Sequence, residues 1–117
     1  MKILVIEDVP EVGELIRTTL EGIPGVDVKV VHTVLEGRRS LLKDRPEWLL
    51  LDEIIPGEYP YDLLAEPAIE GVKVVLITAA YQPEKALPRG ALLRMAKWSW
   101  KEMLPARARI AELLNRG

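Results

Sequence analysis

The chain has 117 residues, 49% of them hydrophobic and 29% charged, with a formal net charge of -2. Its length suits one domain with one hydrophobic core, and its composition is typical of a globular protein rather than a disordered one. The nearly balanced charge gives no basic footprint for nucleic acid or an anionic membrane, and no apolar run approaches the ~20 residues of a membrane span. Cysteine is absent, which excludes disulfides and thiolate chemistry. We therefore expect a single cytoplasmic domain over residues 1–117.

In the first half of the chain, short runs of consecutive apolar residues alternate with segments whose apolar residues have the spacing of a helix. The elements expected here are a strand over residues 2–6, a helix over 9–20, a strand over 26–31, a helix over 33–43 and a strand over 48–51. Asp8 and Thr33 are expected to cap the two helices, because their side-chain oxygens can accept hydrogen bonds from the first turn. Pro10 fits the first turn of its helix, where a missing N–H costs nothing.

Prolines interrupt the second half of the chain and shorten its helices. Pro60 and Pro67 confine a helix over residues 61–69 to roughly two turns, and the segment between Pro83 and Pro88 has room for one turn at most. The remaining expected elements are a strand over residues 72–77, a strand over 92–96 and a final helix between 99 and 115. Strands that alternate with helices in this way predict an α/β fold with a doubly wound, five-stranded parallel sheet.

Residues with reactive or charged side chains follow four of the predicted strands. They are Glu7 and Asp8 after the first strand, Asp52 after the third, Thr78 after the fourth and Lys97 after the fifth. The carboxyl ends of parallel strands meet at one edge of a sheet, where open α/β folds bind their ligands. Three carboxylates that meet there repel one another, and a divalent cation relieves the repulsion. The sequence therefore predicts an acidic pocket suited to a metal ion.

These residue types also suit the transfer of a phosphoryl group. A carboxylate oxygen of Asp52 can act as the nucleophile toward a phosphoryl donor. Glu7 and Asp8 can bind Mg²⁺, which takes carboxylate oxygens, waters and a phosphoryl oxygen in octahedral geometry. The hydroxyl of Thr78 and the ammonium of Lys97 are suited to the phosphoryl oxygens.

Each of these residues also has a simpler structural interpretation. Asp52 could cap the loop that follows it, and Glu7 with Asp8 could favour the start of the first helix. Thr78 could be an ordinary β-branched strand residue, and Lys97 a solvated surface charge. Outside this group we interpret the single histidine and the three tryptophans as structural or interface residues: His32, Trp48, Trp98 and Trp100.

The motifs, taken in order, resemble the receiver domain of two-component response regulators. The matching pieces are residues 3–8, residues 49–52 with Pro56-Gly57, residues 76–79, and Gly90-Ala91 followed by Lys97. The resemblance covers residues 1 to about 114. It implies a flavodoxin-like strand order of 2-1-3-4-5, here with shortened third and fourth helices.

The resemblance also implies a role for each site residue. Asp52 would be phosphorylated by a sensor histidine kinase or a phosphotransfer protein, Thr78 would move toward the phosphoryl group, and Lys97 would pair with it. The ligands of Mg²⁺ would be Glu7, Asp8, Asp52 and the backbone carbonyl of Ile54. The domain would not be an enzyme in the usual sense, because it would catalyse only its own phosphotransfer and a slow autodephosphorylation. It would act as a monomer or weak dimer on an unknown downstream protein, without binding nucleic acid or membrane.

The sequence departs from the family pattern at three places. Lys97 is followed by Trp98 instead of proline, and a cis bond before a non-proline residue costs about 2.5–4 kcal/mol. Arg94 occupies the position of the usual aromatic residue, three before the lysine, and the fourth helix is stunted. These departures support an alternative, a pseudo-receiver that acts as a phosphorylation-independent interaction module. An aspartate-based phosphatase of the haloacid dehalogenase type is disfavoured, because Ile54 stands where that group has a second aspartate.

Overall fold

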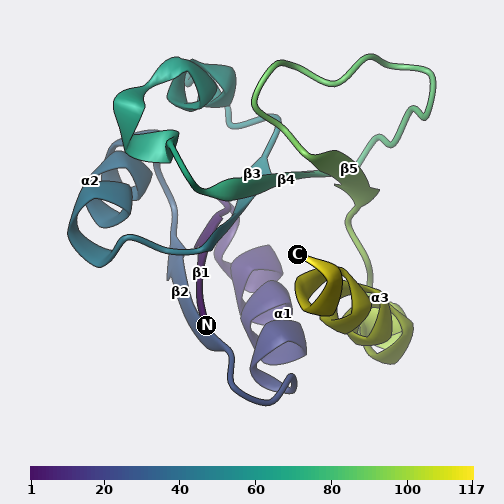
Figure 1. The fold of residues 1–117 in the computed structure, drawn as a ribbon. Helices are drawn as coiled ribbons and strands as arrows, with labels where there is room; N and C mark the ends of the chain where they lie inside the picture. Colours follow the sequence, from purple (N-terminus) through teal and green to yellow (C-terminus); the bar gives the residue numbers. More distant parts are fainter.

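Five parallel strands form one sheet in the order β2-β1-β3-β4-β5 (Figure 1). In this computed structural model, which describes residues 1–117, the strands are β1 (Lys2–Ile6), β2 (Asp27–Val31), β3 (Trp48–Asp52), β4 (Lys73–Thr78) and β5 (Leu93–Ala96). All four neighbouring pairs are parallel. The predicted α/β sheet and its strand order 2-1-3-4-5 are confirmed, and each strand begins and ends within one residue of its predicted range.

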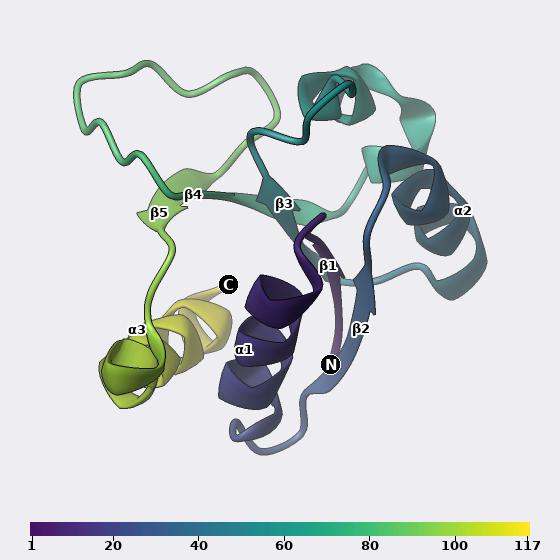
Figure 2. The same cartoon turned by 180° about the vertical axis from the view of Figure 1, so that it is seen from behind.

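Helices cover both faces of this sheet. The α-helices are α1 (Pro10–Glu21), α2 (Val34–Asp44) and α3 (Met103–Arg116), and the 3-10 helices are η1 (Pro60–Ala65), η2 (Pro67–Ile69) and η3 (Trp100–Glu102). The two opposite views show α1 and α3 side by side on one face, with α2 on the other face (Figures 1 and 2). None of these helices combines the length and the apolar character that crossing a membrane requires.

Side chains that alternate along each strand divide the core into two layers. In β1, Ile3 and Val5 pack in the layer with α1 and α3, whereas Leu4 and Ile6 pack in the layer with α2. The central strand β3 is buried along its whole length. Each fully buried aliphatic side chain contributes about 1.5–3 kcal/mol, so β1, β3 and β4 form a firmly packed centre of the sheet. Their carboxyl ends are therefore held at fixed positions.

The connections of the second half contain little helix, as the prolines predicted. The segment 61–69 forms η1 and η2 instead of an α-helix, and the segment 83–88 forms no helix. Glu66, which precedes Pro67, is extended because a proline disfavours helical angles at the residue before it. The loop between β4 and β5, residues 79–92, extends from the end of the sheet without regular structure (Figure 1). The third helix is shortened as predicted, and the fourth is reduced further than predicted, to no helix at all.

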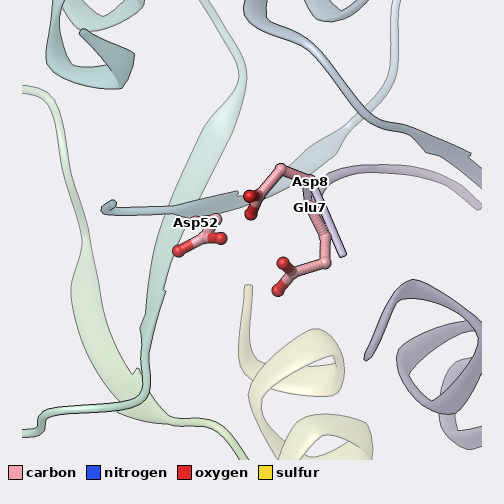
Figure 3. A group of neighbouring side chains, drawn as sticks. All are labelled: Glu7, Asp8 and Asp52. Atoms are coloured by element: carbon pink, nitrogen blue, oxygen red, sulfur yellow. The ribbon is translucent and has the colours of Figure 1, made fainter. Parts of the chain in front are cut away.

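The start of α1 differs from the prediction that Asp8 caps it. The N-cap residue is Val9, no side chain caps it, and the Val9 N–H donates to Glu7 Oε2 at 3.2 Å. The Asp8 carboxylate is instead turned toward that of Asp52, which leaves it unable to reach the first turn (Figure 3). The predicted cap of α2 is correct, because Thr33 Oγ1 accepts a hydrogen bond from the Glu36 N–H at 3.1 Å.

Candidate functional site

Three carboxylates meet at the carboxyl ends of β1 and β3 (Figure 3). Glu7 and Asp8 directly follow β1, Asp52 is the last residue of β3, and oxygens from the three side chains lie within 4.8 Å of one another. Glu7 is 0% exposed and Asp52 2%, while Asp8 is partly exposed. The structure thus brings together the three carboxylates that the sequence predicted to meet at this edge.

Lys97 reaches the carboxylates from the segment that follows β5. Its Nζ lies 2.7 Å from Glu7 Oε1 and 3.2 Å from Asp52 Oδ2. Both of these oxygens are buried, and no other polar group satisfies them. The Lys97 N–H donates to the Thr78 carbonyl at 2.8 Å, and the Lys97–Trp98 bond is trans. Lys97 is therefore an internal counter-ion of the site and not the solvated surface charge of its simpler interpretation.

Burial and neighbouring charges shift the pKa values of two groups in the site. Loss of solvent, followed by the charge of Glu7, raises the pKa of Asp52 to about 7, although Lys97 and the Ile54 N–H favour its charged form. Burial lowers the pKa of the Lys97 ammonium, but the hydrogen bond to Glu7 and the charges of Asp52 and Glu7 outweigh burial, so this pKa is raised. Lys97 is thus a cation at neutral pH and balances part of the negative charge.

Thr78 and Ile54 complete the set of residues that the sequence singled out. Thr78 is the buried last residue of β4, and its Oγ1 accepts a hydrogen bond from the Ala80 N–H at 3.2 Å. The Ile54 N–H donates to Asp52 Oδ1 at 3.2 Å, which orients the carboxylate, while the Ile54 side chain is exposed. Both residues therefore lie at the same edge of the sheet as the carboxylates.

The residues that we interpreted as structural make contacts consistent with that interpretation. The His32 ring Nδ1 lies 2.8 Å from the Glu7 carbonyl oxygen, within hydrogen-bond distance, and fixes the backbone that carries Glu7. Trp48 is core, 1% exposed, and Trp98 donates its indole N–H to Thr19 Oγ1 at 2.9 Å. Trp100 differs from both, because it is 57% exposed.

Sequence reasoning missed an ion pair immediately beside the site. Arg94 Nε lies 2.8 Å from Glu53 Oε2 and its Nη2 lies 2.9 Å from Glu53 Oε1, and each of these side chains is 5% exposed. The Tyr61 hydroxyl also donates to Glu53 Oε1. From the sequence, Arg94 was recognised only as the residue that occupies the place of an aromatic side chain of the family. The signal that could have found the pair was an arginine within a predicted strand, since an arginine side chain removed from solvent requires an acidic partner.

The donor set fits a hard divalent cation. Glu7 Oε1 and Asp52 Oδ2 are buried oxygens that pair with no donor except the Lys97 ammonium, so they retain capacity to bind a metal ion. Carboxylate oxygens are the ligands of Mg²⁺, which also keeps several waters, and partly exposed Asp8 leaves room for them. The three carboxylates together therefore suit Mg²⁺ rather than a softer transition metal.

Comparison with solved structures identifies the class of fold. The response regulator domain of Thermotoga maritima CheB superposes with a TM-score of 0.79 at 14% identity, covering 99% of this chain and 94% of that chain. The N-terminal domain of a response regulator receiver protein from Methanoculleus marisnigri JR1 gives a TM-score of 0.74 at 23% identity, covering 93% and 94%. A CheY-like response regulator receiver domain protein from Methanospirillum hungatei JF-1 gives 0.74 at 21% identity, covering 98% and 96%. No protein-family model matches the sequence, and no curated protein matches it. The chain has the receiver-domain fold over its whole length, as the sequence resemblance implied.

Proposed function

We propose that this protein is a phosphoacceptor receiver domain of a two-component system, phosphorylated on Asp52 by a sensor histidine kinase or a phosphotransfer protein. An oxygen of Asp52 attacks the phosphorus of a phosphohistidine, the P–N bond breaks, and the electron pair of that bond stays with the imidazole nitrogen, which takes up a proton. The product is an acyl phosphate on Asp52. Its formation changes the contacts of the domain with a downstream protein in the cytoplasm.

The position of Lys97 is the observation that carries this proposal. Its Nζ lies 3.2 Å from Asp52 Oδ2, so the oxygens of a phosphoryl group on Asp52 would lie close to a fixed cation. The Thr78 hydroxyl lies at the end of the neighbouring strand and can donate to another phosphoryl oxygen. Glu7, Asp8, Asp52 and the backbone carbonyl of Ile54 would hold Mg²⁺, which neutralises charge that develops on the transferring group.

The residues around the site also support slow loss of the phosphoryl group. Ile54 and Ala80 flank the path of an attacking water in this proposal, and neither side chain can orient or deprotonate a water. The domain would therefore catalyse only its own phosphotransfer and a slow autodephosphorylation.

A pseudo-receiver is the alternative, and a specific contact favours it. Arg94 is held by Glu53 in a buried ion pair, so it cannot rotate as freely as an aromatic side chain at the surface of a strand. A module of this kind would keep the acidic pocket but present the same binding surface with or without a phosphoryl group.

Labelling with a small phosphoryl donor separates the two functions. The protein is incubated with Mg²⁺ and phosphoramidate, and intact-mass spectrometry follows addition of one phosphoryl group. Asp52→Asn keeps the shape of the side chain but removes the nucleophile, so it should stay unlabelled while its circular dichroism spectrum is unchanged. Equal labelling of Asp52→Asn would show that Asp52 is not the acceptor. An unlabelled wild-type protein would favour the pseudo-receiver.

A titration with Mg²⁺ and then beryllofluoride, a mimic of a phosphoryl group, gives a second readout. Trp98 adjoins Lys97 in the chain, so its fluorescence should respond with saturation. Trp48 lies at the opposite end of β3 from Asp52, so its fluorescence should respond little. Trp98→Phe is therefore the control, because this variant should lose the signal if Trp98 is its source. A flat response at millimolar Mg²⁺ would argue against phosphoryl chemistry at this site.

A further inference from the structure

A hydrogen bond between two side chains ties the segment after β5 to helix α1. The Trp98 indole N–H donates to Thr19 Oγ1 at 2.9 Å, and the two residues are 79 positions apart in the chain. Thr19 is fully buried, and its own hydroxyl donates to the Leu15 carbonyl at 2.7 Å. Because that bond uses the single proton of the hydroxyl, the oxygen is left as an acceptor for the indole. The direction of the bond is therefore fixed at both ends.

The acceptor Thr19 is itself held in place by α3. Arg107 donates from Nε to the Thr19 carbonyl at 2.8 Å and from Nη2 to the Thr18 carbonyl at 3.1 Å, in the last turn of α1 where carbonyls lack helical donors. A Cβ at Gly22 would lie 2.1 Å from the Arg107 Cζ, so glycine at this position leaves room for the guanidinium. The two helices lie side by side (Figure 2). Thr19 is thus a rigid anchor between them.

The backbone of Lys97 lies between two fixed contacts. On one side its N–H donates to the Thr78 carbonyl, and on the other side Trp98 is bonded to α1 and packs against the core layer of α1 and α3. The Lys97 side chain has a flexible four-carbon stem, which loses rotamer freedom when its ammonium is fixed. The position of the backbone therefore determines whether the ammonium reaches Glu7 and Asp52 together.

We propose that Trp98, through its hydrogen bond to Thr19, is the positioning residue for the Lys97 ammonium. This inference rests on the proposed function only where Lys97 meets the oxygens of a phosphoryl group. Without the bond, the segment after β5 moves more freely and the ammonium spends less time at the carboxylates. Binding of a phosphoryl group should then weaken. Binding of Mg²⁺ should not weaken, because Lys97 and the metal ion compete for the oxygens of Glu7 and Asp52.

Thr19→Val tests the bond, because valine keeps the shape of threonine but cannot accept from the indole. Calorimetric titration measures the affinity for Mg²⁺ and then, at saturating Mg²⁺, for beryllofluoride. The loss of one hydrogen bond predicts an affinity for beryllofluoride that is weaker by about fivefold, with the affinity for Mg²⁺ unchanged or higher. Thr19→Ser, which retains the hydroxyl, should bind beryllofluoride almost as the wild type does. Ile16→Val, a buried change in the same helix and core layer, is the control for packing and should also retain this affinity.

Trp98→Phe removes the donor instead of the acceptor and should have the same effect, which supplies a second variant if Thr19→Val does not fold by circular dichroism. A direct readout needs neither metal nor phosphoryl group. In ¹H–¹³C spectra of the metal-free protein, a fixed Lys97 should give two separate Hε resonances, which Lys97→Ala identifies by their absence. Thr19→Val and Trp98→Phe should merge them.

If the wild type does not bind beryllofluoride, the proposed function fails, and the Lys97 resonances alone decide whether Trp98 positions the ammonium. Four results would overturn the positioning role. They are wild-type affinity for beryllofluoride in the folded variants that lack the bond, an equal loss in Ile16→Val, a parallel loss of Mg²⁺ affinity, or Lys97 resonances that do not change.

Discussion

Arg94 connects Glu53, the residue after Asp52, to the loop between β4 and β5. Besides its ion pair with Glu53, the guanidinium donates from Nη1 to the Lys85 carbonyl at 2.8 Å and from Nη2 to the Ala86 carbonyl at 3.3 Å. One side chain thus joins the end of β3, the loop 79–92 and β5. In the absence of a fourth helix, these bonds help to hold the loop against the sheet, together with the hydrogen bond from the Leu92 N–H to the Val74 carbonyl.

Replacing Arg94 with methionine should measurably destabilise the protein. The change leaves the Glu53 carboxylate without its cation in a place where its side chain is only 5% exposed, and the hydrogen bond from Tyr61 offsets part of the cost. Urea denaturation measures the loss. Amide exchange of residues 79–92 should also accelerate, because two of the loop carbonyls lose their donor.

The double variant Arg94→Met with Glu53→Leu is the control for this interpretation. Removing both charges should recover most of the lost stability, since a buried pair is often replaceable by apolar residues. If the double variant is as unstable as the single one, then packing of the arginine stem rather than its charge supports the loop.

The sequence predicted the strands well but not the contacts between loops. The apolar run before Asp52 was straightforward to interpret. A short, continuous apolar segment that ends at a carboxylate fits a buried strand of a parallel sheet. The pairing of Arg94 with Glu53 depends on two residues 41 positions apart that meet only after the sheet forms. The prediction that Asp8 caps α1 was wrong for a related reason. Asp8 has the right residue type for a cap, but the acidic cluster determines where its side chain lies.

In metal-free buffer, the stability of the protein should fall as pH rises from about 4 to about 7. The pKa of Asp52 is raised from its ordinary value to about 7 in the folded state, so over this range the folded protein holds a proton that the unfolded chain has released. Folding is therefore favoured at the acidic end, and this contribution is lost as pH rises through the folded pKa. Thermal unfolding at several pH values, compared with Asp52→Asn, measures the effect. A variant with the same pH dependence as the wild type would assign it to another group.

Replacing Asp8 with asparagine should weaken Mg²⁺ binding and raise the metal-free melting temperature. The change removes one of three crowded carboxylates and relieves repulsion among them. Because Val9 and not Asp8 is the N-cap of α1, no helix cap is lost with the carboxylate. Calorimetric titration with Mg²⁺ and a melting curve in EDTA test the two parts. A sharply lower melting temperature in EDTA would contradict the repulsion argument.

Once formed, the phosphorylated protein should keep its phosphate for many minutes rather than seconds. Ala80 is exposed next to Thr78 and has no polar side chain to orient a water. Ala80→Glu should therefore shorten the half-life, measured by intact mass after removal of the phosphoryl donor, whereas Ala86→Glu in the same loop should not. A half-life of seconds in the wild type, or equal half-lives in the two variants, would contradict this role of Ala80.

Trp48 and Trp100 should respond in opposite ways to replacement by alanine. Trp48 is 1% exposed within the core layer of α1 and α3, so Trp48→Ala should lose about 3–5 kcal/mol of unfolding free energy. Trp100 is 57% exposed, and Trp100→Ala should change the unfolding free energy by less than ~1 kcal/mol. An exposed tryptophan that contributes little to stability is available for a protein contact, where aromatic residues are enriched. Sedimentation velocity of the wild type and of Trp100→Ala tests whether that contact is with a second copy. Broad unfolding of Trp100→Ala would instead show that this side chain belongs to the core.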